Sequence, residues 1–138
     1  MAHERGQGGE LARKWLRNAE SDLIAAKALK SIAGVTPNLP AFHFQQAAEK
    51  AMKGLLLLAG ADFPFTHNLK RLAVLVDAAC TGGPFDWPAE LARPSAYAVV
   101  TRYDDDPASK IGTTDLEAAD DAATAVVAMA AARIEAWE

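Results

Sequence analysis

Residues 42–69, FHFQQAAEKAMKGLLLLAGADFPFTHNL, decide the fold of this chain. When successive residues are placed about 100° apart around a helix axis, apolar and polar positions separate onto two sides. The apolar side holds Phe44, Ala47, Ala48, Ala51, Leu55 and Leu58, and the polar side holds His43, Gln46, Glu49, Lys50 and Lys53. The pattern therefore predicts an amphipathic helix that covers a core.

The end of this helix carries a different pattern, because Leu55–Leu58 is apolar on every side. A helix tolerates such a turn where it is covered from more than one direction. We expect the rest of the bundle to cover one side and a second copy of the chain to cover another. This expectation assigns Leu56 and Leu57 to a homodimer interface.

Helical periodicity also appears on both sides of the central segment. The predicted helices cover residues 10–33, 41–59 and about 66–80, with a short irregular helix near Pro88 and a long final helix from Thr114. Thr66 is the expected cap of the third helix, and Thr114 with Glu117 has the spacing of a capping box. No segment reads as a strand. The sequence predicts an all-α, up-and-down helical bundle of four to five helices over residues 10–138, after a disordered segment at residues 1–9.

The composition of the chain argues against several classes of function. The chain has 138 residues, a formal net charge of −4 and one cysteine, Cys80. One domain of this size forms its own core, and the acidic balance excludes a global positive field for nucleic acid. No apolar run is long enough to cross a bilayer, so we expect a cytoplasmic protein without membrane contact. Glycine-rich phosphate loops and zinc-ligand spacings are absent, and neither a cofactor nor a metal is expected.

Several segments together resemble the HEPN family, the higher eukaryotes and prokaryotes nucleotide-binding domain. They are Trp15, Ala19, Asp22 and Leu23; residues 42–53; Thr66-His67-Asn68-Leu69; and Tyr97 with Thr101-Arg102-Tyr103. The resemblance implies a helical bundle, usually a homodimer, often encoded beside a small nucleotidyltransferase. It also implies an association with nucleotide or RNA processing.

Some members of that family are metal-independent ribonucleases that use an arginine and a histidine four to six residues later. Here the positions after Arg102 where the histidine is expected hold Pro107, Ala108 and Ser109. None of these side chains transfers protons near neutral pH. The sequence thus favours a member without catalytic activity, although enzymatic activity stays open.

The candidate site combines residues from three segments. Arg102 offers a planar fork for phosphate, Lys50 and Lys53 offer fixed positive charge, and Gln46 can bond a base or ribose. His67 and Tyr103 complete the nucleotide or phosphate site that we expect in one groove. Each residue also has a structural explanation: Gln46 and the lysines as a solvated face, His67 as a loop or helix-end contact, and Arg102 as a partner of Asp104–Asp106.

The sequence leads to one functional hypothesis and two alternatives. The hypothesis is a non-catalytic module that binds nucleotide or RNA and acts with a separate nucleotidyltransferase, as in toxin–antitoxin pairs. The alternatives are a ribonuclease with a noncanonical histidine and a purely structural dimerisation protein.

Overall fold

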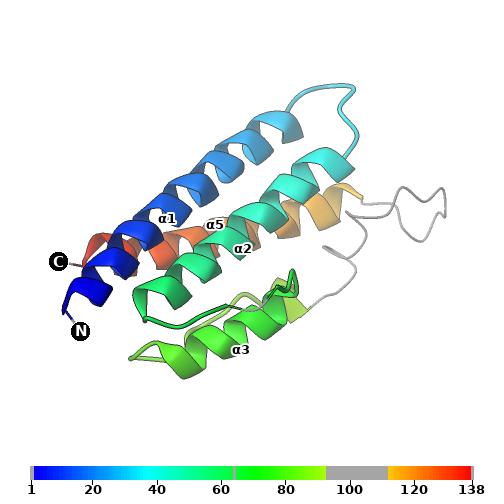
Figure 1. Cartoon of the computed structure of the whole chain (residues 1–138). Helices are drawn as coiled ribbons and strands as arrows, with labels where there is room; N and C mark the ends of the chain where they lie inside the picture. The colour runs from blue at the N-terminus through cyan, green and yellow to red at the C-terminus, as the bar shows by residue number, and fades with distance from the viewer. Residues whose placement is uncertain (1, 64, 93–111, 138) are drawn as a thin grey trace.

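The computed structural model describes residues 2–63, 65–92 and 112–137 (Figure 1). Within these ranges it contains four α-helices, one 3-10 helix and no strand. They are α1 (Ala2–Lys30), α2 (Asn38–Leu58), α3 (Leu69–Ala79), η1 (Ala89–Ala92) and α5 (Thr113–Glu135). The predicted all-α bundle is confirmed.

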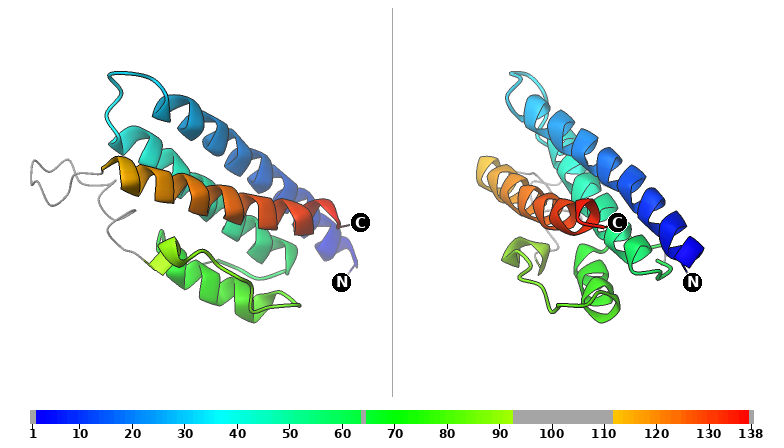
Figure 2. Two further views of the ribbon diagram at one scale, coloured as in Figure 1. Left: turned by 180° about the vertical axis from the view of Figure 1, so that it is seen from behind. Right: turned by 90° about the vertical axis from the view of Figure 1, so that its left-hand side faces the viewer.

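Helix α2 is the centre of the bundle, because α1, α3 and α5 all pack against it (Figures 1 and 2). α1 runs antiparallel to α2, with Asp22 beside His43 and Lys50. The loop after α2 returns along it, so α3 runs in the same direction as α2. The result is a helix that touches three others along its length.

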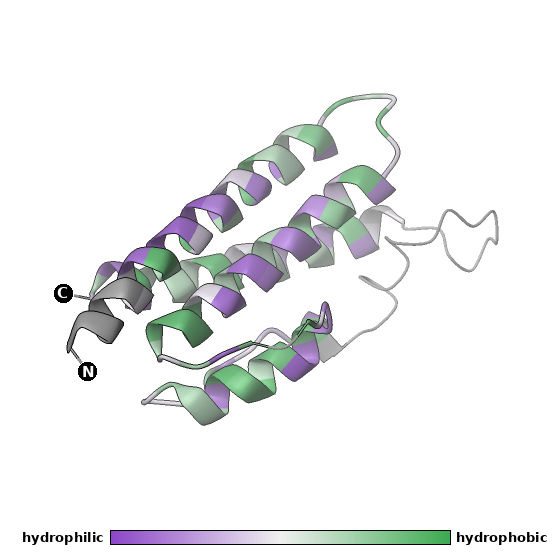
Figure 3. Cartoon of the chain, viewed as in Figure 1, coloured by the Kyte–Doolittle hydropathy of each residue, from purple (hydrophilic) through white to green (hydrophobic). Residues whose placement is uncertain are grey.

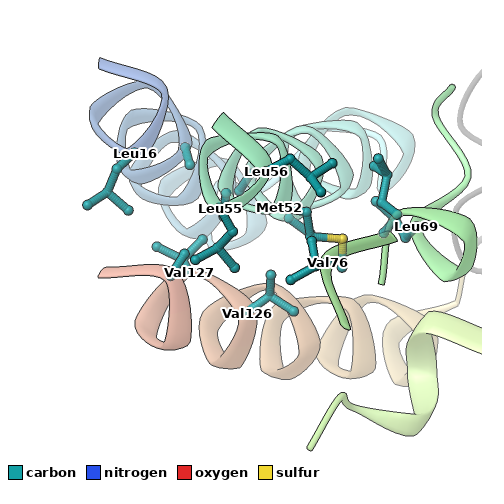
Figure 4. Packing of buried hydrophobic residues seen from close by; sticks show 14 of the residues in the cluster. Leu16, Met52, Leu55, Leu56, Leu69, Val76, Val126 and Val127 are labelled. Carbon is teal, nitrogen blue, oxygen red and sulfur yellow. The ribbon is translucent and has the colours of Figure 1, made fainter. Parts of the chain in front are cut away.

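The core consists largely of small and aliphatic side chains. Met52, Leu55 and Leu56 of α2 lie between Leu16 of α1 and Val126 of α5, as Figure 4 shows. A second, smaller cluster packs at the other end of the bundle around Phe44. Alanines at the remaining contacts let the helix axes approach closely. The apolar side predicted for the central helix is buried here, except that Leu58 is only partly buried.

The first helix begins earlier than predicted, at Ala2 instead of Glu10. Residues 2–9, predicted to be disordered, are helical. Gly8 and Gly9 lie where neighbouring segments leave no room for a side chain. A Cβ atom on Gly8 would lie 2.7 Å from the Leu57 carbonyl oxygen, and one on Gly9 would overlap the Trp137 indole.

Proline and glycine set the bounds of α2. The helix begins at Asn38, so Pro40 lies in its first turn, where the missing N–H has no helical acceptor to lose. The second helix was predicted to begin at residue 41, and it begins three residues earlier, at Asn38. Gly60 has a φ of +77°, as expected for a left-handed residue directly after a helix.

Two predicted helix caps were wrong by a few residues. Asn68, rather than Thr66, caps α3: its Oδ1 accepts from the Arg71 amide at 3.1 Å, while the Thr66 hydroxyl accepts from the Asn68 amide. An amide side chain satisfies an N-terminal N–H as well as a hydroxyl does, so the sequence allows either residue.

The final helix also begins before its predicted cap. Gly112 precedes the first turn, and its amide donates to the Asp115 carboxylate at 3.1 Å. The predicted pair was Thr114 with Glu117. Glu117 instead lies 2.8 Å from the Lys30 ammonium of α1.

Asp120 of α5 ties that helix to the end of α1. Its carboxylate accepts from Lys27 at 2.6 Å, from Lys30 at 2.7 Å and from the Thr124 hydroxyl at 3.0 Å. Burial by itself raises the pKa of Asp120, but these three donors lower it below its ordinary value. The hydrogen bonds hold the two helices together at the end of the bundle away from the termini.

The apolar turn Leu55–Leu58 forms the hydrophobic end of α2 in Figure 3. It is covered mostly by its own chain. Leu56 is only 1% exposed, so its side chain has almost no surface to offer a second copy. Leu57 is partly buried against the same core. The fold therefore explains this turn without a partner at Leu56, and of the two predicted interface residues Leu57 alone retains exposed surface.

Gly54 marks the closest approach of three helices. A Cβ atom there would lie 3.2 Å from Ile134 Cδ1, 3.4 Å from the Ala12 carbonyl and 3.5 Å from Trp15 Cβ. We expect Gly54→Val to lower the free energy of unfolding by about 1–3 kcal/mol, because overpacking forces neighbours out of place. Urea denaturation measures the loss. Ala128→Val, on the exposed side of α5, is the control and should change stability by no more than about 0.5 kcal/mol; equal stability of both variants would contradict the packing.

Candidate functional site

A buried carboxylate, Glu49, lies in the middle of α2, and its side chain is 5% exposed. Oε1 accepts from Gln45 Nε2 at 2.9 Å and pairs with His67 Nδ1 at 2.8 Å. Oε2 accepts from Lys53 Nζ at 3.0 Å. Gln45 and Lys53 stand one helical turn before and after Glu49, and His67 comes from the loop that returns along α2. Each carboxylate oxygen thus has a donor, as a buried charge requires.

These contacts set the pKa of Glu49. Burial alone raises it, but the hydrogen bonds from His67, Lys53 and Gln45 bring the pKa below its ordinary value. Glu49 is therefore a carboxylate near neutral pH, which can only accept hydrogen bonds. It follows that Nδ1 of His67 carries the hydrogen and donates it.

The imidazole of His67 joins this buried charge to the protein surface. Its side chain is 78% exposed although Nδ1 bonds a carboxylate that is almost fully buried. With Nδ1 bonded to Glu49, Nε2 is the ring nitrogen left for solvent or a ligand. A carboxylate that holds one ring nitrogen in this way sets both the tautomer and the orientation of the ring.

A second carboxylate, Asp22 of α1, also pairs with one histidine and one lysine, and both of these belong to α2. It lies 3.0 Å from His43 Nδ1 and accepts from Lys50 Nζ at 2.6 Å. Asp22 and Lys50 are 14% and 29% exposed, compared with 5% for Glu49 and 8% for Lys53. The Asp22 cluster joins α2 to α1, and the Glu49 cluster joins α2 to the loop before α3.

The predicted basic face of α2 is occupied by these internal contacts. Lys53, expected to offer charge to a phosphate or to be solvated, is buried, bonds Glu49 and lies 5.2 Å from the Phe63 ring centre. Lys50 is paired with Asp22, and Gln46 donates to the side-chain oxygen of Gln45 at 2.8 Å. The solvated-face explanation is wrong for Lys53, because its side chain is buried against Glu49 and Phe63.

The comparison with family models agrees with this architecture. The model described as HEPN domain matches residues 12–134. The chain belongs to the HEPN family. Neither the curated proteins nor the solved structures contain a match. The HEPN match covers α2, α3 and η1 completely, α1 from residue 12 and α5 up to residue 134.

Two residues of the candidate HEPN site, Arg102 and Tyr103, lie outside the described residues, as do Asp104–Asp106. Whether Arg102 shares a groove with His67 therefore stays a prediction. Lys53 and His67 both bond Glu49, and Gln46 bonds Gln45, whereas Lys50 pairs with Asp22 of α1.

The described part of the HEPN chain contains no group of three or more histidine, cysteine or acidic side chains placed to hold a metal ion. Among its helices, none combines the length and the apolar character needed to cross a membrane.

Sequence reasoning missed Gln45 and the role of Glu49. The signal was present, because Gln45, Glu49 and Lys53 follow one another at intervals of four residues. Such spacing places side chains in contact along a helix. The sequence contained no sign that His67 would complete the group, because that contact depends on the path of the loop.

The Glu49 cluster predicts a pH-dependent contribution to stability. Glu49→Gln leaves Lys53 buried without its partner, so we expect the free energy of unfolding to fall by about 3–5 kcal/mol at pH 7. Because the folded-state pKa of Glu49 is lowered, its ionisation stabilises the fold above the unfolded-state pKa of about 4.3. This stabilisation is lost as the pH falls through the lower, folded-state value, and denaturation at several pH values should show the wild type and variant converging there.

Asp22→Asn is the matched control, since Asp22 also binds one histidine and one lysine. Its partner Lys50 is 29% exposed and can turn toward water, whereas Lys53 is 8% exposed. The control should therefore cost about 1 kcal/mol or less. Equal losses in the two variants would contradict the special position of Glu49.

Proposed function

We propose that this HEPN protein is a non-catalytic module that binds nucleotide or RNA phosphates and acts with a separate nucleotidyltransferase in the cytoplasm. The observation that carries the proposal is the fixed, exposed imidazole of His67, anchored at Nδ1 to Glu49. A protonated Nε2 donates a charge-assisted hydrogen bond to a phosphate oxygen. The ring is held in place before any ligand arrives, which reduces the entropy lost on binding.

We propose that the protein does not cleave RNA, because this reaction requires two groups that transfer protons. Cleavage of RNA without a metal uses one group to take a proton from the 2′-hydroxyl and another to protonate the leaving oxygen. In the described residues, His43 is bound to Asp22 rather than placed beside His67. The sequence has no histidine in the expected interval after Arg102.

A ribonuclease with a noncanonical histidine is the second candidate, and the Glu49–His67 pair favours it. A carboxylate that orients an imidazole is the arrangement found behind many general bases. In this version His67 Nε2 takes the proton of the 2′-hydroxyl, and Arg102 stabilises the charge on the phosphate.

A homodimer is part of the proposal, and the family resemblance supports it. The remaining exposed surface of Leu57 and the small side chains of α5 are the features available for contact between two copies. Light scattering at tens of micromolar should give twice the 14.6 kDa chain mass. Leu57→Asp should shift the protein toward monomer, because an unpaired charge in an apolar interface is costly. A wild-type monomer at these concentrations would contradict the dimer.

Calorimetry with nucleotides and short RNA, beside a cleavage assay, tests the main proposal. We expect binding that weakens as salt rises, no cleavage, and a loss of about 1–3 kcal/mol of binding free energy in Arg102→Ala, the cost of a lost hydrogen bond to a charged group. His67→Ala should weaken binding without abolishing the fold, because the ring is mostly exposed.

The other outcomes decide between the alternatives. Cleavage that disappears in His67→Ala would replace the proposal with the ribonuclease. Failure of every nucleotide and RNA to bind at low salt would leave only the structural dimerisation protein. A nucleotidyltransferase gene next to this one, and co-purification of its product, would support the proposed partner.

A further inference from the structure

The loop between α2 and α3 contains two phenylalanines, of which Phe63 is partly buried and Phe65 is exposed. Phe63 packs against Trp15 of α1, with ring centres 5.2 Å apart, and lies beside the Lys53 ammonium. Phe65, two residues later, is fully exposed. Within the part of the chain that the structure describes, Phe65 is the most exposed of the large apolar side chains.

Phe65 is not on a loose segment. The loop beside it is held by the bond from His67 to Glu49, and the Asn68 amide donates to the Thr66 hydroxyl. Asn68 then caps α3 through the Arg71 amide. These bonds involve consecutive residues directly after Phe65. The exposed ring therefore stands next to a backbone whose course is fixed.

Positive charge gathers next to this ring. Lys70 and Arg71, in the first turn of α3, are exposed, and within the described residues neither has an ion-pair partner. Asp62 is the only acidic residue in the segment from Gly60 to Val76. The segment is thus locally basic in a chain whose net charge is −4. This contrasts with α2, where Lys50 and Lys53 are paired internally.

We infer that Phe65, His67, Lys70 and Arg71 form a binding surface for single-stranded RNA, which we name the loop–α3 surface. An exposed aromatic ring stacks on an unpaired base, and neighbouring cations contact the backbone phosphates. His67 Nε2, the ring nitrogen that is not bonded to Glu49, can bond a phosphate as well. A duplex offers no accessible base face for Phe65, so single strands are favoured. The inference rests on the proposed function and adds Lys70 and Arg71 of α3 to its charged contacts.

Fluorescence anisotropy with a labelled single-stranded RNA of about twelve nucleotides tests the inference. Phe65→Ala should weaken binding by about fivefold to about a hundredfold, the range for losing one stacked base, whereas Phe65→Trp should retain it. Lys70→Ala combined with Arg71→Ala should weaken binding and reduce its dependence on salt. An RNA duplex of the same length should compete less well than the single strand.

Matched variants elsewhere on the surface provide the controls. Lys14→Ala with Arg17→Ala removes the same charge from exposed positions of α1, and Ile24→Ala removes an exposed apolar side chain. Neither should change RNA affinity by more than about twofold, since neither adjoins the proposed stack. Circular dichroism on all variants confirms that the fold is intact, as expected for substitutions at exposed sites.

The outcomes separate this inference from the proposed function. If the wild type binds neither RNA nor nucleotides at low salt, both fail. If the wild type binds RNA and Phe65→Ala binds equally well, only the loop–α3 surface is overturned. The same conclusion follows if the α1 charge variant loses as much affinity as the Lys70 and Arg71 variant. An acidic peptide that displaces the RNA equally from wild type and Phe65→Ala would also overturn it.

Discussion

The buried carboxylate of Glu49 is the constraint on which the described site depends. A charge at this depth is tolerated because Gln45, Lys53 and His67 donate to it. Two of these donors belong to α2 itself, and the third must come from outside the helix. The loop after α2 therefore runs back along the helix far enough to bring His67 to its middle, and α3 begins from that point.

The central position of α2 follows from its small residues. Ala47, Ala48 and Ala51 are completely buried, and Gly54 leaves room for Ile134 and the first helix. Short side chains let three helices approach one axis, which a helix lined with large residues would prevent. The same packing leaves only part of the α2 surface uncovered, and the returning loop occupies much of that part. The site is thus built on the most constrained element of the bundle.

Internal pairing changes how the charges of this chain are interpreted. Lysines on α2 that look available for a ligand are partners of Asp22 and Glu49. Paired charges contribute to the joints between elements and less to the field outside the molecule. What remains for a ligand is the imidazole of His67, together with the exposed Lys70 and Arg71 of α3, for which the described residues supply no ion-pair partner.

Helical periodicity in the sequence was enough to predict the number of main helices, their buried sides and the termination at Gly60, because these depend on local spacing and backbone preference. The resemblance of residues 42–53 and 66–69 to the HEPN family was likewise visible in the chain. The exact N-terminal cap of α3 could not be predicted from the sequence, because Thr66 and Asn68 are both able to satisfy an N-terminal amide. Only the tertiary structure decided that Glu49 and Lys53 are buried, that Leu56 belongs to its own core and that residues 2–9 are helical. Each of these depends on which distant segment covers the residue, and the spacing of residues along one helix does not specify that segment.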